Sequence, residues 1–152
     1  IMDPMDDAFD FALRAALNSE ALLEASNNLS IKTEFDGVNT ISISRPRLVD
    51  ELGSNVGSVE VSKPIGITSQ VLNKIEGTVV FTYIVQVKDN DGATVFLEWV
   101  DDLSTSDEGV ESSIFWTPDT TGAYQVEIFV WENVLNPLPL APIKSIRVVV
   151  NG

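Results

Sequence analysis

The segment from Ser58 to the C-terminus constrains the fold of this 152-residue chain most, because short runs of alternating apolar and polar residues follow one another there. An alternation with a period of two places successive side chains on opposite faces of a β-strand. Turn residues separate the runs at regular spacing, and we expect six or seven strands from them. Many short strands with regularly spaced turns are typical of a β-sandwich.

The alternation also predicts which side chains face the core. The positions expected to point inward are Val79, Phe81, Tyr83, Val85 and Val87; Val95, Leu97 and Trp99; Val110, Ser112, Ile114 and Trp116; Tyr124, Val126, Ile128 and Val130; and Ile146, Val148 and Val150. The DNDG turn at 89–92 is expected to close a hairpin between the first two runs. The short run from Val59 is followed by Pro64, which predicts an edge strand because proline cannot donate a ladder hydrogen bond.

Residues 4–25 carry a different, helical period. Phe9, Leu13 and Leu17 recur at every fourth position and therefore share one apolar face of a helix. The side chain of Asp3 can accept hydrogen bonds from the free N–H groups of the first turn. The sequence therefore predicts an amphipathic helix over about 4–25.

A β-hairpin is predicted after this helix. Alternating residues between Ile31 and Ser44 flank an Asp36-Gly37 pair, which favours a tight turn. Residues 45–57 then indicate a connector. We therefore divide the chain into an N-terminal segment of helix plus hairpin, residues 1–53, and a β-sandwich domain, residues 58–152.

Charge and two missing residue types limit the function. Nine Lys and Arg against 23 Asp and Glu give a net charge of −14, which repels a phosphate backbone and excludes nucleic acid as an expected partner. The chain has no Cys and no His, so it lacks thiolate nucleophiles, His-dependent catalytic dyads and the usual zinc and copper ligands. Glu98 beside Trp99 and Glu127 near Trp131 are the nearest approach to a glycosidase pair, but outward strand positions explain them better. We expect a protein that is not an enzyme.

Two patterns suggest binding or modification. Asp89, Asp91, Asp101 and Asp102 are weak candidates for Ca²⁺ ligands, because carboxylate oxygens suit that ion. The alternative is that they form a turn and a solvated acidic loop. Asn28 begins an Asn-Leu-Ser sequon, so glycosylation is expected there if the protein is extracellular. No other cofactor is expected.

The segment TGAY places Tyr124 directly before a strand run. It resembles the tyrosine corner of immunoglobulin-like (Ig-like) and fibronectin III-like domains, in which the Tyr hydroxyl bonds back to the backbone. Trp99 matches the usual core Trp of such domains. More narrowly, FTYIVQVKDNDGATVFLEWV and FWTPDTTGAYQVEIFVWENVLNPLPLAP resemble Ig-like modules of surface and secreted proteins of ammonia-oxidising archaea. The resemblance covers about residues 58–152 and implies a mainly β, Ig-like antiparallel sandwich, with the helix and hairpin outside it.

Some apolar residues fall on the face of the strands opposite to the expected core. Phe129 and Trp131 are outward if their neighbours point inward, and Phe96 and Val100 are outward by the same count. Because these strands are neighbours in an Ig-like topology, the four side chains are expected to form one patch. Either the chain's own helix or hairpin covers it, or it is an interface with another subunit.

The resemblance implies a structural or interaction role at the extracellular cell surface of an archaeon, with protein partners or self-assembly. A helix followed by a sandwich is similar to pilin-like subunits and membrane-anchored proteins. The chain begins with Ile1 rather than Met, so we interpret it as a processed or trimmed product, whose contact with a membrane would run through a missing upstream anchor. The alternatives are a repeat cut from an array of modules, or a calcium- or glycan-binding accessory domain of a membrane-anchored surface protein.

Overall fold

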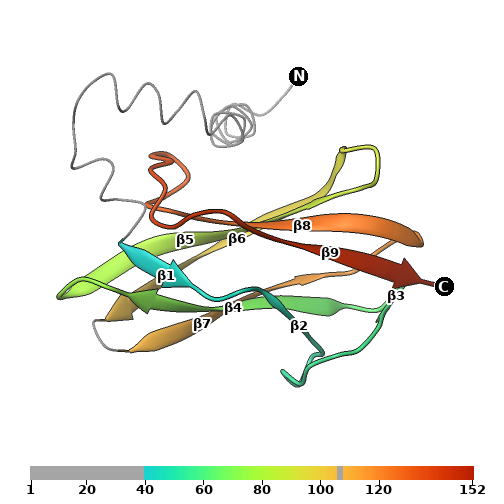
Figure 1. Cartoon of the computed structure of the whole chain (residues 1–152), viewed down its shortest axis with the longest axis horizontal. Coiled ribbons are helices and arrows are strands. Elements are labelled where there is room, and N and C mark those ends of the chain that lie inside the picture. The colour runs from blue at the N-terminus through green and yellow to red at the C-terminus, as the bar shows by residue number, and fades with distance from the viewer. Residues whose placement is uncertain (1–39, 106–107) are drawn as a thin grey trace.

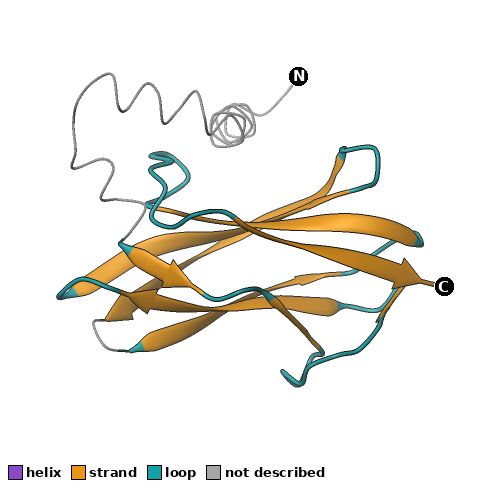
Figure 2. Ribbon diagram, viewed as in Figure 1, coloured by secondary structure: helices purple, strands orange, loops and turns teal. Residues whose placement is uncertain are grey.

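Nine β-strands make up the part of the chain that the computed structural model describes, residues 40–105 and 108–152 (Figures 1 and 2). They are β1 (Ile41–Ile43), β2 (Arg47–Val49), β3 (Val59–Glu60), β4 (Ile65–Asn73), β5 (Thr78–Lys88), β6 (Thr94–Thr105), β7 (Gly109–Trp116), β8 (Gly122–Trp131) and β9 (Lys144–Asn151). The predicted helix 4–25, the first strand and turn of the predicted hairpin, and Asn28 lie outside these residues. Within them, no helix has the length and hydrophobicity needed to cross a membrane.

The strands form two sheets that pack face to face, as Figure 1 shows. In the four-stranded sheet, β4 lies at the centre, pairing antiparallel with β1 and β2 on one side and with β7 on the other. The five-stranded sheet has the order β3-β9-β8-β5-β6, in which only the β3–β9 pair is parallel. The short strand predicted at an edge, before Pro64, is confirmed as β3.

The division of the chain between residues 53 and 58 is wrong. β1 and β2 belong to the sandwich, because Ile41 pairs with Asn73 and Val49 pairs with Gly66 of β4. Ile41 is fully buried in the core. Residues 45–57 are therefore not a plain connector. Two strands of three residues on either side of Pro46 are too short to show a clear alternation, which explains why the sequence pattern missed the second of them.

Both sheets turn their apolar faces toward each other. The inward faces predicted for β5, β7, β8 and β9 are confirmed: Phe81, Tyr83, Val85, Val87, Ser112, Ile114, Trp116, Tyr124, Val126, Ile128, Val130, Val148 and Val150 are buried, with Val79, Val110 and Ile146 partly buried beside them. A period-two pattern places such residues on one face, and burying that face between the sheets supplies the main stabilisation of a sandwich.

The inward face predicted for β6 is wrong. Phe96 pairs with Val87, so it points into the core, where its ring centroid lies 6.5 Å from that of Trp116. Trp99 pairs with Ile84 on the opposite face and is 40% exposed, whereas Trp116 on β7 is 4% exposed and is the core tryptophan. Both faces of β6 carry apolar residues, so the alternation alone could not show which face is turned inward.

Tyr124 lies where the chain turns into β8. Its hydroxyl donates a hydrogen bond of 2.8 Å to the carbonyl oxygen of Thr120, and its ring meets Trp116 edge-on at 5.1 Å between centroids. A Tyr at the start of this strand that bonds back to the backbone four residues upstream has the geometry of a tyrosine corner. The bond holds the turn against the core beneath it.

Tyr83, the second tyrosine of the core, makes the folded state less stable at alkaline pH. Tyr83 is fully buried, and its hydroxyl lies 2.9 Å from that of Ser69. Burial raises the pKa of the Tyr83 hydroxyl far above its ordinary value of 10.0, and the hydrogen bond with Ser69 offsets this only in part. The folded state therefore holds this proton more tightly than the unfolded state. The contribution of the protonated Tyr83 hydroxyl to the free energy of unfolding is complete below the pKa of the unfolded state and is lost as the pH rises above that value.

We expect the free energy of unfolding to fall by about 1.4 kcal/mol per pH unit through this group once the pH exceeds about 10. In Tyr83→Phe this part of the slope disappears, although the variant is less stable at neutral pH because Ser69 loses its hydroxyl partner. Urea unfolding at a series of pH values on both sides of about 10 measures the two slopes. Equal slopes in the two proteins would show that Tyr83 does not cause the alkaline loss.

Candidate interaction surface

An apolar cluster lies on the outer face of the five-stranded sheet, which is the face turned away from the other sheet. Ile84 pairs with Phe129 and adjoins Trp131; these three residues, here called the outer cluster, are at most 1% exposed. The rings of Phe129 and Trp131 have centroids 5.9 Å apart at an angle of 60°. Phe129 and Trp131 thus point outward, in the direction that the alternation gives them, but they are buried.

The other two members of the predicted patch, Phe96 and Val100, are not on this face. Val100 pairs with Tyr83, a core residue, so it shares the inner face with Phe96. Because β6 is the edge strand of its sheet, Val100 remains 38% exposed there. The reversed face of β6 accounts for both errors. It brings Leu97 instead against the outer cluster, together with Val134 from the loop after β8.

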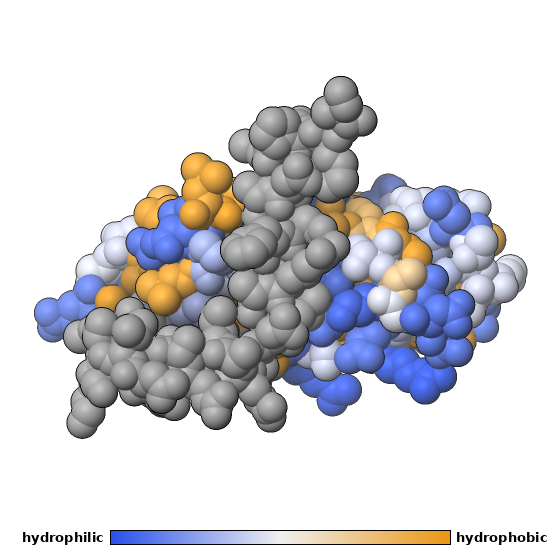
Figure 3. Space-filling model, turned by 90° about the horizontal axis from the view of Figure 1, so that it is seen from above, coloured by the Kyte–Doolittle hydropathy of each residue, from blue (hydrophilic) through white to orange (hydrophobic). Residues whose placement is uncertain are grey.

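Exposed apolar side chains lie on strands β5 and β6, and two of them, Val80 and Leu103, are on this outer face. Val80 of β5 and Leu103 of β6 form a cross-strand pair, with 61% and 52% of their surfaces exposed. Val95 is 49% exposed at the other end of β6, where the register shifts at a bulge. Figure 3, which views this side of the molecule, shows hydrophobic side chains among the polar ones. A cross-strand apolar pair left in water is a feature of contact surfaces.

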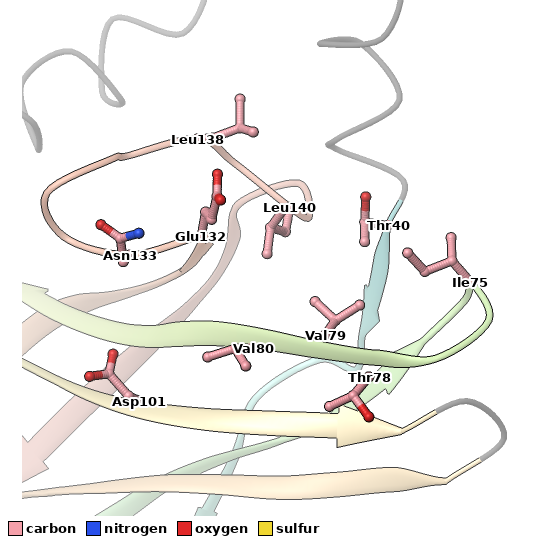
Figure 4. A pocket seen from close by; sticks show the side chains of 10 residues that line it. All are labelled: Thr40, Ile75, Thr78, Val79, Val80, Asp101, Glu132, Asn133, Leu138 and Leu140. Carbon is pink, nitrogen blue, oxygen red and sulfur yellow. The ribbon is translucent and has the colours of Figure 1, made fainter.

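A hollow of about 820 Å³ adjoins Val80 at the end of the sandwich where β5 begins (Figure 4). Among the described residues, it is lined by Thr40, Ile75, Thr78, Val79, Val80, Asp101, Glu132, Asn133, Leu138 and Leu140. One wall is the loop between β8 and β9, which folds back through hydrogen bonds from Glu132 N to Leu138 O, 2.9 Å, and from Leu140 N to Val130 O, 2.9 Å.

The two carboxylates of the hollow are held by neighbours. Asp101 accepts a hydrogen bond of 2.6 Å from the Thr82 hydroxyl, and Glu132 accepts one of 2.8 Å from the Asn136 amide. The chain has no His or Cys, and the described residues of the lining include no Lys or Arg. The described lining therefore offers apolar contact and hydrogen-bond acceptors.

The structure separates the calcium candidates. Asp89 accepts hydrogen bonds of 2.9 Å from the backbone N–H groups of Asp91 and Ala93, and so shapes the β5–β6 turn. Asp101 lies toward the far end of β6 on the outer face, and Asp102 lies on the inner face, where it accepts a bond of 3.2 Å from Ser112. Throughout residues 40–105 and 108–152, no three acids gather into a group able to hold a metal ion.

The acids beside tryptophans do not form a pair either. Glu98 pairs with Val85 on the inner face, whereas Glu127 pairs with Gln86 on the outer face. Glu127 also makes a salt bridge of 3.0 Å to Lys88. Two carboxylates on opposite faces of a sheet cannot flank one glycosidic bond.

Sequence reasoning missed the Val80–Leu103 pair and the hollow. The Val79-Val80 doublet was a signal, since one member of two adjacent apolar residues in a strand must point outward. The hollow could not be found in this way, because its wall is a loop whose path depends on backbone hydrogen bonds to β8.

Comparison with known proteins connects this arrangement to solved structures. The C-terminal domain of wzt superposes with a TM-score of 0.62 at 13% identity, covering 74% of each chain. A β-glucosidase, EmGH1 from Erythrobacter marinus, gives 0.53 at 11% identity, covering 73% of this chain and 15% of the enzyme. The domain is an immunoglobulin-like β-sandwich. A CARDB domain from Pyrococcus furiosus matches 73% of this Ig-like chain at 20% identity, with a TM-score of 0.47. No family model and no curated protein matches the sequence.

Proposed function

We propose that this Ig-like domain is a non-enzymatic interaction module of an extracellular archaeal surface or filament assembly. Its partners are other copies of the chain or other proteins of the same assembly. The archaeal and extracellular parts of the proposal rest on the resemblance of residues 58–152 to surface modules. The net charge of −14 supports a role without nucleic acid.

The exposed Val80–Leu103 pair carries the interaction part of the proposal. It lies where β5 begins and the edge strand β6 ends, and it continues into a hollow with the apolar side chains of Ile75, Leu138 and Leu140. Burying apolar surface is the main driving force of most protein association. An edge strand beside such a surface also offers backbone hydrogen bonds to a partner.

The arrangement of ionisable groups supports a non-enzymatic role. The two carboxylates of the hollow accept hydrogen bonds from Thr82 and Asn136. Glu98 and Glu127 on the strands lie on opposite faces of the sheet. Among the described residues, the group with a strongly shifted pKa is Tyr83, which is fully buried between the sheets, where a substrate cannot reach it. A calcium- or glycan-binding role has no comparable support, because the four candidate carboxylates are divided between two ends and two faces of β6.

Sedimentation of the full chain at increasing protein concentration tests the proposal. We expect reversible self-association that weakens at least about tenfold in Val80→Asp/Leu103→Asp, because two charges would replace the apolar contact. Both side chains are more than half exposed, so the substitutions leave the core intact.

Val149→Asp is the matched control. Val149 is 55% exposed on the outer face of the same sheet but lies on β9, two strands away from β5. We expect it to associate like the wild type. A chain that stays monomeric at every concentration would refute self-assembly through this surface, and equal weakening by both variants would show that added charge alone was responsible.

A further inference from the structure

The edge strand β6 differs from the other edges of the sandwich. At the opposite edge of its own sheet, β3 has two residues, and in the other sheet β1 and β2 have three residues each and are separated by Pro46. Short or proline-broken edge strands protect a sheet from pairing with other chains. β6, by contrast, has 12 residues and no proline. It pairs with β5 on one side, and no strand in the part of the chain that the structure describes pairs with its other side.

The middle of β6 is exposed on both faces. On the inner face, Glu98 and Val100 are exposed, whereas Ile114 on the inner face of β7, the edge strand of the other sheet, is buried. On the outer face, Trp99 and Leu103 are 40% and 52% exposed. A strand hydrogen-bonded to the open side of β6 would continue the sheet and pack its side chains beside these residues on both faces.

The charge of β6 indicates what kind of strand it would bind. Glu98, Asp101 and Asp102 are acidic, and residues 89–143 contain no Lys or Arg. Opposite charges across a strand pair stabilise it, whereas like charges directly opposite each other destabilise it. The β6 strand of a second copy would bring the same three acids and is therefore a poor partner. A strand with basic residues complements the edge.

The sequence of β6 also gives the pattern of its partner. From Leu97 to Leu103 the residues are, in order, apolar, acidic, apolar, apolar, acidic, acidic and apolar. An antiparallel partner, the commoner arrangement, meets them in reverse order. The matching strand is therefore apolar, basic, basic, apolar, apolar, basic and apolar. Its basic residues lie opposite Asp102, Asp101 and Glu98, and its apolar residues lie opposite apolar ones.

We propose that β6 binds an extended segment of another protein by antiparallel strand addition, and that this segment carries Lys or Arg opposite Glu98, Asp101 and Asp102. The added strand makes the five-stranded sheet six-stranded. The inference extends the proposed function by naming the chemistry of a further partner, and it does not depend on self-association through Val80 and Leu103.

A synthetic peptide tests the added strand. The probe is a labelled Val-Lys-Lys-Val-Val-Lys-Val peptide with both ends capped, titrated with the full chain while its fluorescence anisotropy is measured. We expect saturable binding. Two further peptides carry N-methyl groups on alternate residues, one at the odd and one at the even positions. Because successive N–H groups of a strand point to opposite edges, only one of the two should lose affinity, by at least about tenfold.

Two results of this titration would overturn the proposal. The first is an unmodified peptide that does not bind. The second is an equal effect of the two methylation patterns, because attraction between a basic peptide and an acidic protein does not depend on which edge of the peptide is blocked.

A charge exchange tests the register. Glu98→Lys should bind the unmodified peptide at least about threefold more weakly than the wild type. It should bind Val-Lys-Lys-Val-Val-Glu-Val more tightly, because the sixth residue of the peptide lies opposite residue 98. Glu51→Lys is the matched control, since Glu51 is exposed in the turn after β2 and its replacement changes the net charge equally. Identical behaviour of the two variants would refute the proposed pairing along β6.

Val80→Asp separates strand addition from self-association. Val80 lies on β5, away from the open side of β6. We expect its replacement to weaken self-association in sedimentation while the peptide affinity stays within about twofold of the wild type. Loss of self-association in Glu98→Lys would instead place a strand of a second copy on β6 and contradict the assignment to another protein.

Discussion

Replacing Trp116 with Ala should lower the free energy of unfolding by about 3–5 kcal/mol. Trp116 is 4% exposed between the sheets, where it contacts Phe96 at 6.5 Å and Tyr124 at 5.1 Å between ring centroids. Removing its ring leaves a cavity next to the turn that Tyr124 holds. A domain of this kind has a total stability of about 5–15 kcal/mol, so the loss is a large part of it.

Trp99→Ala is the matched control for this experiment. Trp99 is the tryptophan that the resemblance to Ig-like domains assigns to the core, yet it is 40% exposed on β6. We expect its replacement to cost less than half as much as that of Trp116, as measured by urea unfolding followed by circular dichroism. A larger loss of stability for Trp99→Ala would mean that Trp99 is the core tryptophan, as the sequence predicts, and that the inner and outer faces of β6 are reversed.

Phe129→Asp should destabilise the protein by about 4 kcal/mol or more, because it removes a buried ring and places a carboxylate in an apolar site. Phe129 is 1% exposed and packs against Ile84 and Trp131 in the outer cluster. The expected loss of stability follows from the burial of Phe129. The alternating pattern of the strand alone would place this outward side chain in solvent. Thermal unfolding of the full chain measures it.

Val149→Asp makes the same change at an exposed position of the same outer face. Val149 pairs with Ala123 and is 55% exposed on β9. We expect a loss within about 0.5 kcal/mol there, as for most surface substitutions. If Phe129→Asp were equally harmless, the outer cluster would be open to water in solution.

The two pairs of variants concern different layers of one domain. Trp116 tests the contact between the sheets, and Phe129 tests the packing of the outer cluster. The surface proposed for interaction, at Val80 and Leu103, belongs to neither layer. Its variants should therefore alter association while leaving the free energy of unfolding nearly unchanged, which separates the interaction proposal from the structural ones.

Alternation was a reliable guide wherever one face of a strand was clearly more apolar than the other. In β5, Phe81, Tyr83 and Val85 left no doubt about the inward face, although the outer face proved to be buried as well. In β6, Phe96 and Trp99 lie on opposite faces, and both are aromatic. The choice between them depends on the register with β5 and on the bulge near Val95, which local sequence does not specify.

The candidate site was harder to predict than the fold. The outward direction of Phe129 and Trp131 followed from counting along β8, because side-chain direction in a strand is a local property. The exclusion of Phe96 and Val100 from the outer face did not follow from the sequence, because it depends on how β6 pairs with β5. The hollow needs the loop 132–143 to fold back onto Val130, and such loop contacts are decided by non-local hydrogen bonds.

The sequence alone determined that the chain is a mainly β sandwich with an acidic surface and no His or Cys chemistry, because composition and period-two patterning are local properties of the chain. It also located the turn at Tyr124. Only the tertiary structure decided that residues 41–49 join the sandwich, that Trp116 rather than Trp99 fills the core, and that Phe129 and Trp131 are buried on the outer face. Each of these depends on which strand lies beside which, and pairing between residues far apart in the chain is set by the packing of the whole domain.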